Sequence, residues 1–134
     1  MIAVDTSVVV AAFASWHEAH RAAIRLLDRR PRLPAHVLIE SYSVLTRLPA
    51  PHRAEARIAA AFLAERFPAA LLTLPANAQA ALVAAAASAG LTGGSVYDAL
   101  IAATARHAGA LLLTRDRRAV PTYESVGARY EMLA

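Results

Sequence analysis

The amino-acid sequence predicts an α/β fold in which a mostly parallel sheet is covered by helices. The first observation is the regular alternation of short apolar segments with longer segments of helical pattern. The second is composition, because 57% of the residues are hydrophobic and only 5 are glycine, as in chains with a packed core. A length of 134 residues is the size of one compact domain, so we expect residues 1–134 to form a single domain.

Five short apolar segments are predicted to be strands, each bounded by turn residues or by a helical pattern. The first four would form the parallel sheet, and the last would add an edge strand. They lie at residues 2–4, 32–35, 71–74, 110–114 and 128–132.

Six helices are predicted between these strands, at residues 6–14, 17–30, 36–48, 53–67, 76–89 and 95–107. Asp5, Thr6 or Ser7 could cap the first helix, since short polar side chains bind free amides at helix starts. Prolines at 31, 49 and 68 end the second, third and fourth helices, because proline cannot continue a helix. Glycine at 90 is expected to close the fifth helix at its C-terminal cap.

Four acidic residues lie next to or within apolar segments, where an unpaired carboxylate would be costly. Asp5 and Asp116 directly follow predicted strands, and Glu40 lies early in the helix at 36–48. Asp98 lies at the start of the helix that leads into the strand at 110–114. Because the ends of such elements meet at the carboxyl edge of a parallel sheet, we expect the four carboxylates to converge there.

Three of these acids also have a local structural explanation. Asp5 could be a plain helix cap, and Ser95 with Asp98 resembles a capping box. Asp116 stands among three arginines and could belong to an exposed turn or ion pair. Glu40 has no comparable explanation, since it lies within a helix amid apolar residues. The joint pattern favours one shared site.

A group of carboxylates in a chain without cysteine forms a hard oxygen site. Such a site suits Mg²⁺ or Mn²⁺ and disfavours zinc. Divalent ions held in this way commonly support hydrolysis of phosphodiesters. Mutual repulsion among the acids should also make the metal-free protein less stable.

The basic residues suggest a polyanionic partner. All 14 are arginine, and the net charge is +4. A chain rich in alanine and arginine is also what a GC-rich genome would encode, so charge alone leaves the partner open. Arg115, Arg117 and Arg118 lie beside Asp116 and are candidates for phosphate contacts. The aromatic residues Trp16 and Tyr97 could stack on bases, although core packing is the favoured interpretation.

Several features indicate a protein of the cytoplasm without a membrane segment. The absence of cysteine fits a reducing compartment. Asp5 interrupts the first apolar stretch, and no basic region precedes it, which argues against a secretory signal. The mildly apolar stretch at 71–91 contains proline, asparagine and glutamine, which argues against a membrane span. His17 and His20 have ligand-like spacing but lie among charged residues, so we expect them on the surface.

Four sequence motifs resemble those of the PIN-domain family, and within it the VapC-type toxins of bacterial toxin–antitoxin pairs. They cover nearly the whole chain in family order. The motifs are MIAVDTSVVVAAF, LPAHVLIESYSVLTRLP, GLTGGSVYDALIAATARHAGA and LLLTRDRRAVPTYESVGARY.

The resemblance implies a PIN-like three-layer domain that acts as a metal-dependent endoribonuclease. Its acidic quartet around Mg²⁺ or Mn²⁺ would be Asp5, Glu40, Asp98 and Asp116, with Asp5 and Asp98 as the leading ligands. The small polar residues beside the acids would orient a carboxylate, a metal-bound water or a phosphate, although helix or turn capping explains them equally well. These residues are Thr6, Ser7 and Thr114, and Arg117 is a further candidate for substrate positioning.

The resemblance also implies partners. Members of this family usually form homodimers and are silenced by a small antitoxin protein in a hetero-oligomer. RNA would be the substrate, but its identity does not follow from the motifs.

Two alternatives remain to be weighed. A phosphotransferase of the haloacid-dehalogenase kind needs a second aspartate where this chain has Ser7, and it needs a lysine, which the chain lacks. The same lack excludes a Walker P-loop. A catalytically idle PIN module that binds protein or RNA is the remaining alternative, and the intact set of four acids argues against it.

Overall fold

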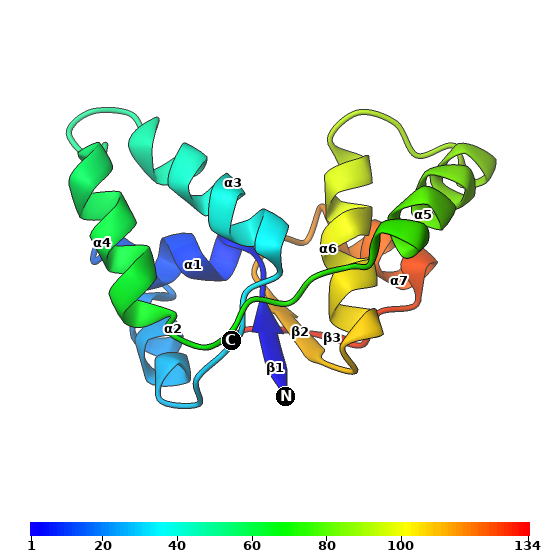
Figure 1. Cartoon of the computed structure of the whole chain (residues 1–134). Coiled ribbons are helices and arrows are strands. Elements are labelled where there is room, and N and C mark those ends of the chain that lie inside the picture. The colour runs from blue at the N-terminus through cyan, green and yellow to red at the C-terminus, as the bar shows by residue number, and fades with distance from the viewer.

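The computed structural model describes residues 1–134 and contains a parallel three-stranded sheet (Figure 1). Its strands are β1 (Ile2–Val4), β2 (Leu111–Thr114) and β3 (Tyr130–Met132), in the spatial order β1-β2-β3. Val4 pairs with Leu113, so β2 ends one residue beyond the end of β1. The predicted parallel sheet is confirmed, and the residues that follow β1 and β2 emerge at the same edge.

Seven helices flank the sheet in two groups. In Figure 1, α1 to α4 lie on one side of the strands, and α5 to α7 lie on the other. The sheet therefore forms the middle of three layers, as the α/β fold class predicts. The helices are α1 (Thr6–Phe13), α2 (His20–Leu27), α3 (Ala35–Thr46), α4 (Ala56–Arg66), α5 (Ala76–Ala89), α6 (Ser95–His107) and α7 (Val120–Val126). None of them has the length and apolar character needed to cross a lipid bilayer.

Two of the predicted strands are wrong. Residues 32–35 and 71–74 form only single parallel bridges, from Arg32 to Ala3 and from Pro34 to Leu72. They run parallel to β1 at its side, and the amide of Arg32 donates to the carbonyl of Ile2 at 2.9 Å. Pro31 and Pro34 lack an amide hydrogen, which prevents a longer ladder in this segment.

Helix α7 was not predicted from the sequence. It is only seven residues long and begins with a proline in its first turn, a position that proline tolerates. Gly127 ends it with φ 83°, a left-handed conformation that glycine adopts without strain. Buried Thr122 and Tyr123 anchor the helix to the protein. A helix this short carries too little periodicity to be recognised by pattern.

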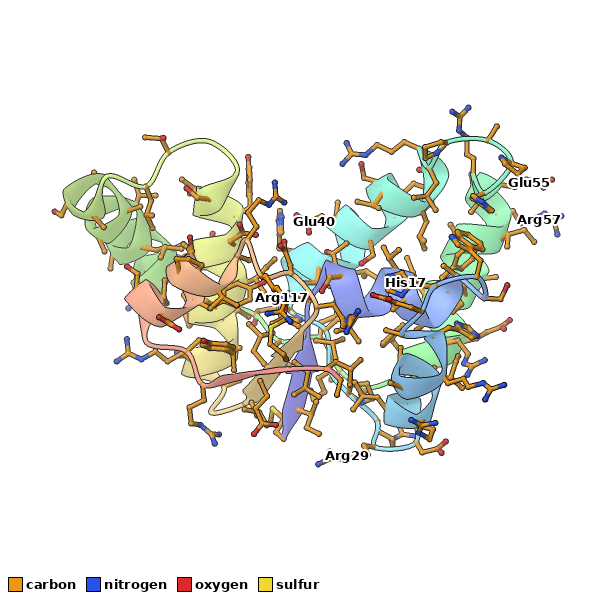
Figure 2. The ribbon with its side chains drawn as sticks, turned by 180° about the vertical axis from the view of Figure 1, so that it is seen from behind. His17, Arg29, Glu40, Glu55, Arg57 and Arg117 are labelled. Carbon is orange, nitrogen blue, oxygen red and sulfur yellow. The ribbon has the colours of Figure 1, made fainter.

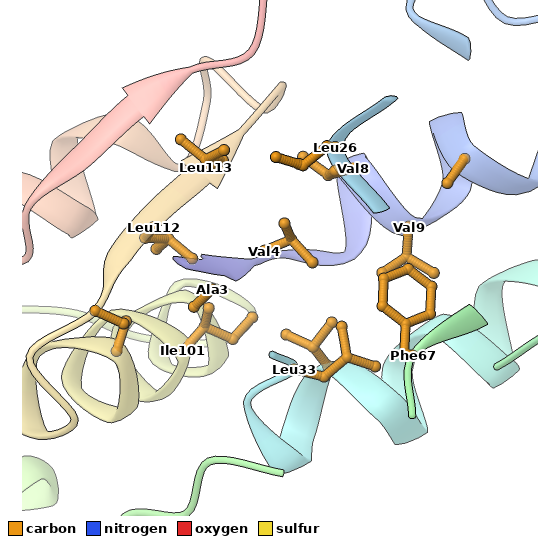
Figure 3. Close-up of a cluster of buried hydrophobic side chains, with 14 of the residues drawn as sticks. Ala3, Val4, Val8, Val9, Leu26, Leu33, Phe67, Ile101, Leu112 and Leu113 are labelled. Atoms are coloured by element: carbon orange, nitrogen blue, oxygen red, sulfur yellow. The ribbon is translucent and has the colours of Figure 1, made fainter. Parts of the chain in front are cut away.

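The main core packs around β1 and β2 (Figure 3). Val4 and Leu112 are fully buried in the two strands. In Figure 3, Ile101 from α6 lies on the same side of β1 as Leu33 and Phe67, and Val8 and Leu26 lie on the other side. Many of the other core residues are alanines, which let the helices approach the short strands closely. This packing holds the ends of β1 and β2 in place, where the acidic residues follow.

One polar side chain is buried in this interior without a partner. Ser41 lies on the inner face of α3 with none of its surface exposed, and its hydroxyl makes no hydrogen bond. An unsatisfied buried hydroxyl destabilises a fold, because it has lost its bonds to water without replacing them.

We therefore expect Ser41→Ala to raise the free energy of unfolding by about 1 kcal/mol more than Ser43→Ala does. Ser43 lies exposed on the same helix, so its replacement reports only the gain in helix propensity. Urea unfolding at pH 7 would measure both variants. A smaller gain for Ser41→Ala would show that its hydroxyl has a partner in solution.

Candidate functional site at the carboxyl edge of the sheet

A polar cavity of about 900 Å³ opens where β1 and β2 end. It is lined by the start of α1, by α3, by the start of α6 and by the segment after β2. Glu40, Asp98 and Asp116 all line this cavity, whereas Asp5 lies buried at its base. An apolar cavity of about 540 Å³ between α5, α6 and α7 contains none of the four acids. Three of the four acids therefore share one cavity at this edge of the sheet, and the fourth does not line it.

Asp5 is the most heavily bonded of the four acids. Its Oδ1 accepts bonds from the amide of Ser7 at 3.0 Å and from the Ser7 hydroxyl at 2.5 Å. Its Oδ2 accepts bonds from the hydroxyl of Thr114 and from that of Tyr123, the latter at 2.7 Å. Burial raises the pKa of Asp5 above its ordinary value, although these hydrogen bonds act in the opposite direction. Asp5 therefore caps α1, as its local structural explanation predicted. Its side chain also links α1, β2 and α7 through hydrogen bonds.

Ser7 and Thr114 connect Asp5 to the segment after β2. The Ser7 hydroxyl accepts a bond from the amide of Arg115 at 2.7 Å. The Thr114 hydroxyl accepts a bond from the amide of Asp116 at 2.9 Å. Each hydroxyl therefore donates to Asp5 and accepts from the backbone that carries the next residues of the site.

Glu40 reaches the cavity from α3 and is labelled in Figure 2. Thr6 donates its hydroxyl hydrogen to Oε1 at 2.5 Å, and Nε2 of His36 lies 3.2 Å from Oε2. The side chain is 32% exposed, so it is neither a core residue nor freely solvated. Thr6 and His36 hold the Glu40 carboxylate facing the cavity from two sides.

Asp98 lies in the first turn of α6 and has no such support. The expected capping box is wrong, because Ser95 lies inside the helix and its hydroxyl donates to the carbonyl of Thr92. Burial, together with the charges of Asp116, Glu40 and Asp5, raises the pKa of Asp98 to about 6. The acids are thus close enough to repel one another, and Asp98 is the one whose charge is least compensated.

Asp116 follows β2 in a turn that its own side chain stabilises. Oδ1 accepts a bond from the amide of Arg118 at 3.0 Å, and the Arg118 guanidinium lies 3.6 Å from Oδ2. Asp116 therefore belongs to a turn and to an ion pair, as its local structural explanation predicted. The side chain still faces the cavity beside the other acids.

Arginines at the rim of the cavity differ from those singled out in the sequence. Arg115 and Arg118 line it, and so does Arg47 at the end of α3, which the motifs did not indicate. Arg117 is exposed and does not line the cavity. Arg115 is also structural, because its guanidinium bonds Glu18 at 2.8 Å and the carbonyl of Leu133 at 3.0 Å.

Five further residues depart from the sequence-based expectations. Tyr123 was missed, because α7 was not predicted and nothing in the local sequence links it to Asp5. Trp16 and Tyr97, expected in the core, are 51% and 53% exposed. The neighbouring histidines His17 and His20 are half-buried and bond backbone groups rather than standing free in solvent.

The donor set suits a hydrated divalent ion better than a closed protein cage. No three acidic or histidine side chains are grouped as they would be around one metal ion. Mg²⁺ keeps several of its waters and uses one or two carboxylates, so a closed cage is not required. Asp98 has no competing hydrogen bond at its carboxylate, and three further carboxylates surround it.

The bond from Tyr123 to Asp5 should contribute measurably to stability. Tyr123→Phe leaves a buried carboxylate with one donor fewer, so we expect the free energy of unfolding to fall by about 1–3 kcal/mol. Tyr130→Phe is the matched control, because its hydroxyl bonds Glu124 on the surface. Urea unfolding at pH 7 would compare the two, and equal losses would contradict the assigned importance of the Asp5 bond.

The raised pKa of Asp98 predicts that the metal-free protein loses folding stability as the pH rises. The folded state holds this proton more tightly than the unfolded state, so stability falls as pH rises from about 4 to about 6. Asp98→Asn should therefore be more stable than wild type at pH 7, by about 1 kcal/mol after discounting for solvent screening.

The difference in stability between Asp98→Asn and wild type should shrink as the pH falls and vanish below the ordinary pKa of 3.8, where Asp98 is protonated in both the folded and the unfolded wild type. Thermal melts with EDTA across this range would measure it, with exposed Asp28→Asn as the control. A gain that is independent of pH would contradict the electrostatic cause.

Comparisons with known proteins match this chain to one family. The family model for the PIN domain matches residues 2–124. Ribonuclease VapC40 of Mycobacterium tuberculosis is 50% identical over 133 residues, which cover 99% of each chain. Ribonuclease VapC27 of the same organism is 43% identical over 134 residues, covering 99% of this chain and 97% of that protein.

Solved structures show the same fold at low sequence identity. FitAcB from Neisseria gonorrhoeae superposes with a TM-score of 0.69 at 19% identity, over 97% of this chain and 96% of that one. FitAB bound to an IR36 DNA fragment gives a TM-score of 0.69 at 18% identity, over 98% and 94%. With its sheet-edge acids and its full-length similarity to these ribonucleases, the chain belongs to the PIN-domain family, among the VapC-type members.

Proposed function

We infer that the protein is an endoribonuclease that acts as the toxin of a toxin–antitoxin pair, and we propose that it depends on Mg²⁺ or Mn²⁺. The observation that carries this function is the gathering of Glu40, Asp98 and Asp116 around one cavity above buried Asp5. Full-length similarity to two proteins named ribonucleases supports RNA as the substrate.

The acids and their supporting residues would share the work of holding a divalent ion. Asp98 and Asp116 offer carboxylate oxygens at the cavity wall, and Glu40 offers one from the facing helix. Asp5 would act from below, where its charge adds to the attraction for a cation. When bound, the ion supplies activation of water and neutralisation of charge at the phosphodiester.

The remaining polar residues would bind and orient the RNA. Arg47 and Arg118 at the rim would bind phosphates, since both side chains are exposed and line the cavity. Thr6 keeps the carboxylate of Glu40 in place, so that it can hold a water or a metal ligand. Ser7 and Thr114 would keep Asp5 and the backbone of Asp116 in register.

We further propose a cognate antitoxin and a homodimer as partners, as for other VapC-type proteins. Ile39 and Tyr42 on α3 are 68% and 39% exposed next to Glu40 in the sequence. These side chains do not line the cavity, but they offer apolar contacts to a protein partner that binds α3 beside it. Such a partner would silence the ribonuclease by blocking access to the acids.

The decisive experiment is cleavage of total cellular RNA by the purified protein with Mn²⁺, Mg²⁺ or EDTA. We expect discrete fragments that require the metal and that fall about 100-fold or more in Asp98→Asn. This variant keeps the shape of the side chain and removes its charge. Asp28→Asn makes the same change at an exposed position outside the cavity and should cleave like wild type.

Absence of cleavage would have a definite meaning if the protein is folded, loaded with metal and freed of any copurified antitoxin. It would overturn the ribonuclease function and favour a catalytically idle module. Cleavage that persists in EDTA would instead reject the metal dependence while leaving the ribonuclease in place.

A further inference from the structure

Tyr97 is an exposed aromatic residue at the cavity whose position the proposed chemistry does not yet explain. It is 53% exposed, lines the cavity and directly precedes Asp98. An exposed aromatic ring that lines the cavity is available to stack on a flat ligand.

The ring of Tyr97 lies parallel to that of His36. Their centroids are 4.9 Å apart and their planes differ by 4°. His36 belongs to α3 and Tyr97 to α6, so the pair bridges the two helices that border the cavity. Histidine stacks on one face of the ring, and 53% of Tyr97 remains exposed, so the residue keeps surface on which a ligand could stack.

The same contacts that orient Glu40 also hold this pair. Nε2 of His36 lies 3.2 Å from Glu40, whose other oxygen accepts the bond from Thr6. The histidine ring is therefore fixed from one edge, and it supports the tyrosine ring from behind. A flat apolar surface that is already ordered loses little entropy when a second flat group binds to it.

A nucleobase is the ligand whose shape and chemistry fit this surface. Bases stack on exposed aromatic rings in proteins that bind single strands, and every base has a suitable face. Charge supports this choice, since Arg47 and Arg118 at the rim can take the phosphates on the same strand. A duplex cannot use the surface, because its bases are already stacked within the helix.

We propose that Tyr97, backed by His36, is a nucleobase platform that seats an unpaired nucleotide next to the bond that is cut. Its assignment rests on the ribonuclease function proposed above. The enzyme would then select RNA by the presence of an unpaired base within reach of Asp98. Hairpin loops, bulges and single strands would be substrates, and continuous duplex would not.

A second stacked pair in the chain offers a matched control. Trp16 is 51% exposed and stacks on His52, with centroids 3.9 Å apart and planes 23° apart. It resembles the Tyr97 pair in exposure and in its histidine partner, yet it does not line the cavity. Trp16→Leu should therefore leave RNA cleavage unchanged.

The test uses a short single-stranded RNA that contains a cleavage site mapped with the wild-type protein. Tyr97→Leu, which keeps an apolar side chain and removes the ring, should lower kcat/KM about 5- to 150-fold. Tyr97→Phe, which keeps the ring, should stay within a few-fold of wild type. Annealing the substrate to its complement should abolish cleavage by the wild-type protein.

An abasic substrate series isolates the stacking contact. One base at a time is removed on either side of the cut, and wild type is compared with Tyr97→Leu. When the missing base is the one that Tyr97 would hold, wild type and Tyr97→Leu should cleave the substrate equally, because neither can make the stacking contact. An effect of Tyr97→Leu that is equal on all abasic substrates, or absent on the intact one, would overturn the platform.

Failure of the platform can be told apart from failure of the ribonuclease function. If the wild-type protein cleaves RNA and Tyr97→Leu cleaves equally well, the function stands and the platform falls. If that variant instead loses only its inhibition by the antitoxin, Tyr97 serves a protein partner, and the platform also falls.

If no protein cleaves RNA, quenching of a 2-aminopurine base in a single-stranded RNA probe still reports stacking. Quenching that Tyr97→Leu abolishes and Trp16→Leu retains would support the platform as a binding site alone. Equal quenching in both variants would overturn it.

Discussion

The buried carboxylate of Asp5 is the constraint on which the rest of the site depends. A charged group with 3% of its surface exposed needs several donors, and here both oxygens are saturated. The donors come from the start of α1, the end of β2 and α7, so one side chain ties together three segments that are distant in sequence. Because Thr114 and Ser7 also accept bonds from the backbone after β2, the position of Asp116 follows from that of Asp5.

Stability and function oppose each other at this edge of the sheet. Core packing around Val4 and Leu112 brings the strand ends together, and the acids that follow them repel one another. The arginines offset this charge only in part, since Arg118 pairs with Asp116 at 3.6 Å but is 90% exposed at the rim, and Arg115 is directed to Glu18 and Leu133. Negative charge is therefore concentrated at the cavity floor and positive charge at its rim. That separation suits a cation below and a phosphate backbone above.

Sequence patterns predicted the elements whose ends carry a clear chemical signal. Both ends of α5 and α6 were predicted correctly. Glycines at 90, 93 and 94 separate the two helices, Pro75 precedes α5, and Gly109 follows α6. The segment at 32–35 failed as a strand, since its flanking and internal prolines leave too few amides for a ladder. Helix α7 was not predicted, because a segment of seven residues with an early proline shows no helical periodicity.

The sequence by itself determined the fold class, the family and the gathering of the acids, because strand ends in a parallel sheet share one edge. Only the tertiary structure decided how each acid is held. The bond from Tyr123 to Asp5 joins residues 118 positions apart, and the stacking of Tyr97 on His36 joins two helices. Such contacts depend on side-chain directions and on the placement of whole elements. Local propensity and spacing carry no information about either, so burial, partners and exposed ring faces appear only once the chain is folded.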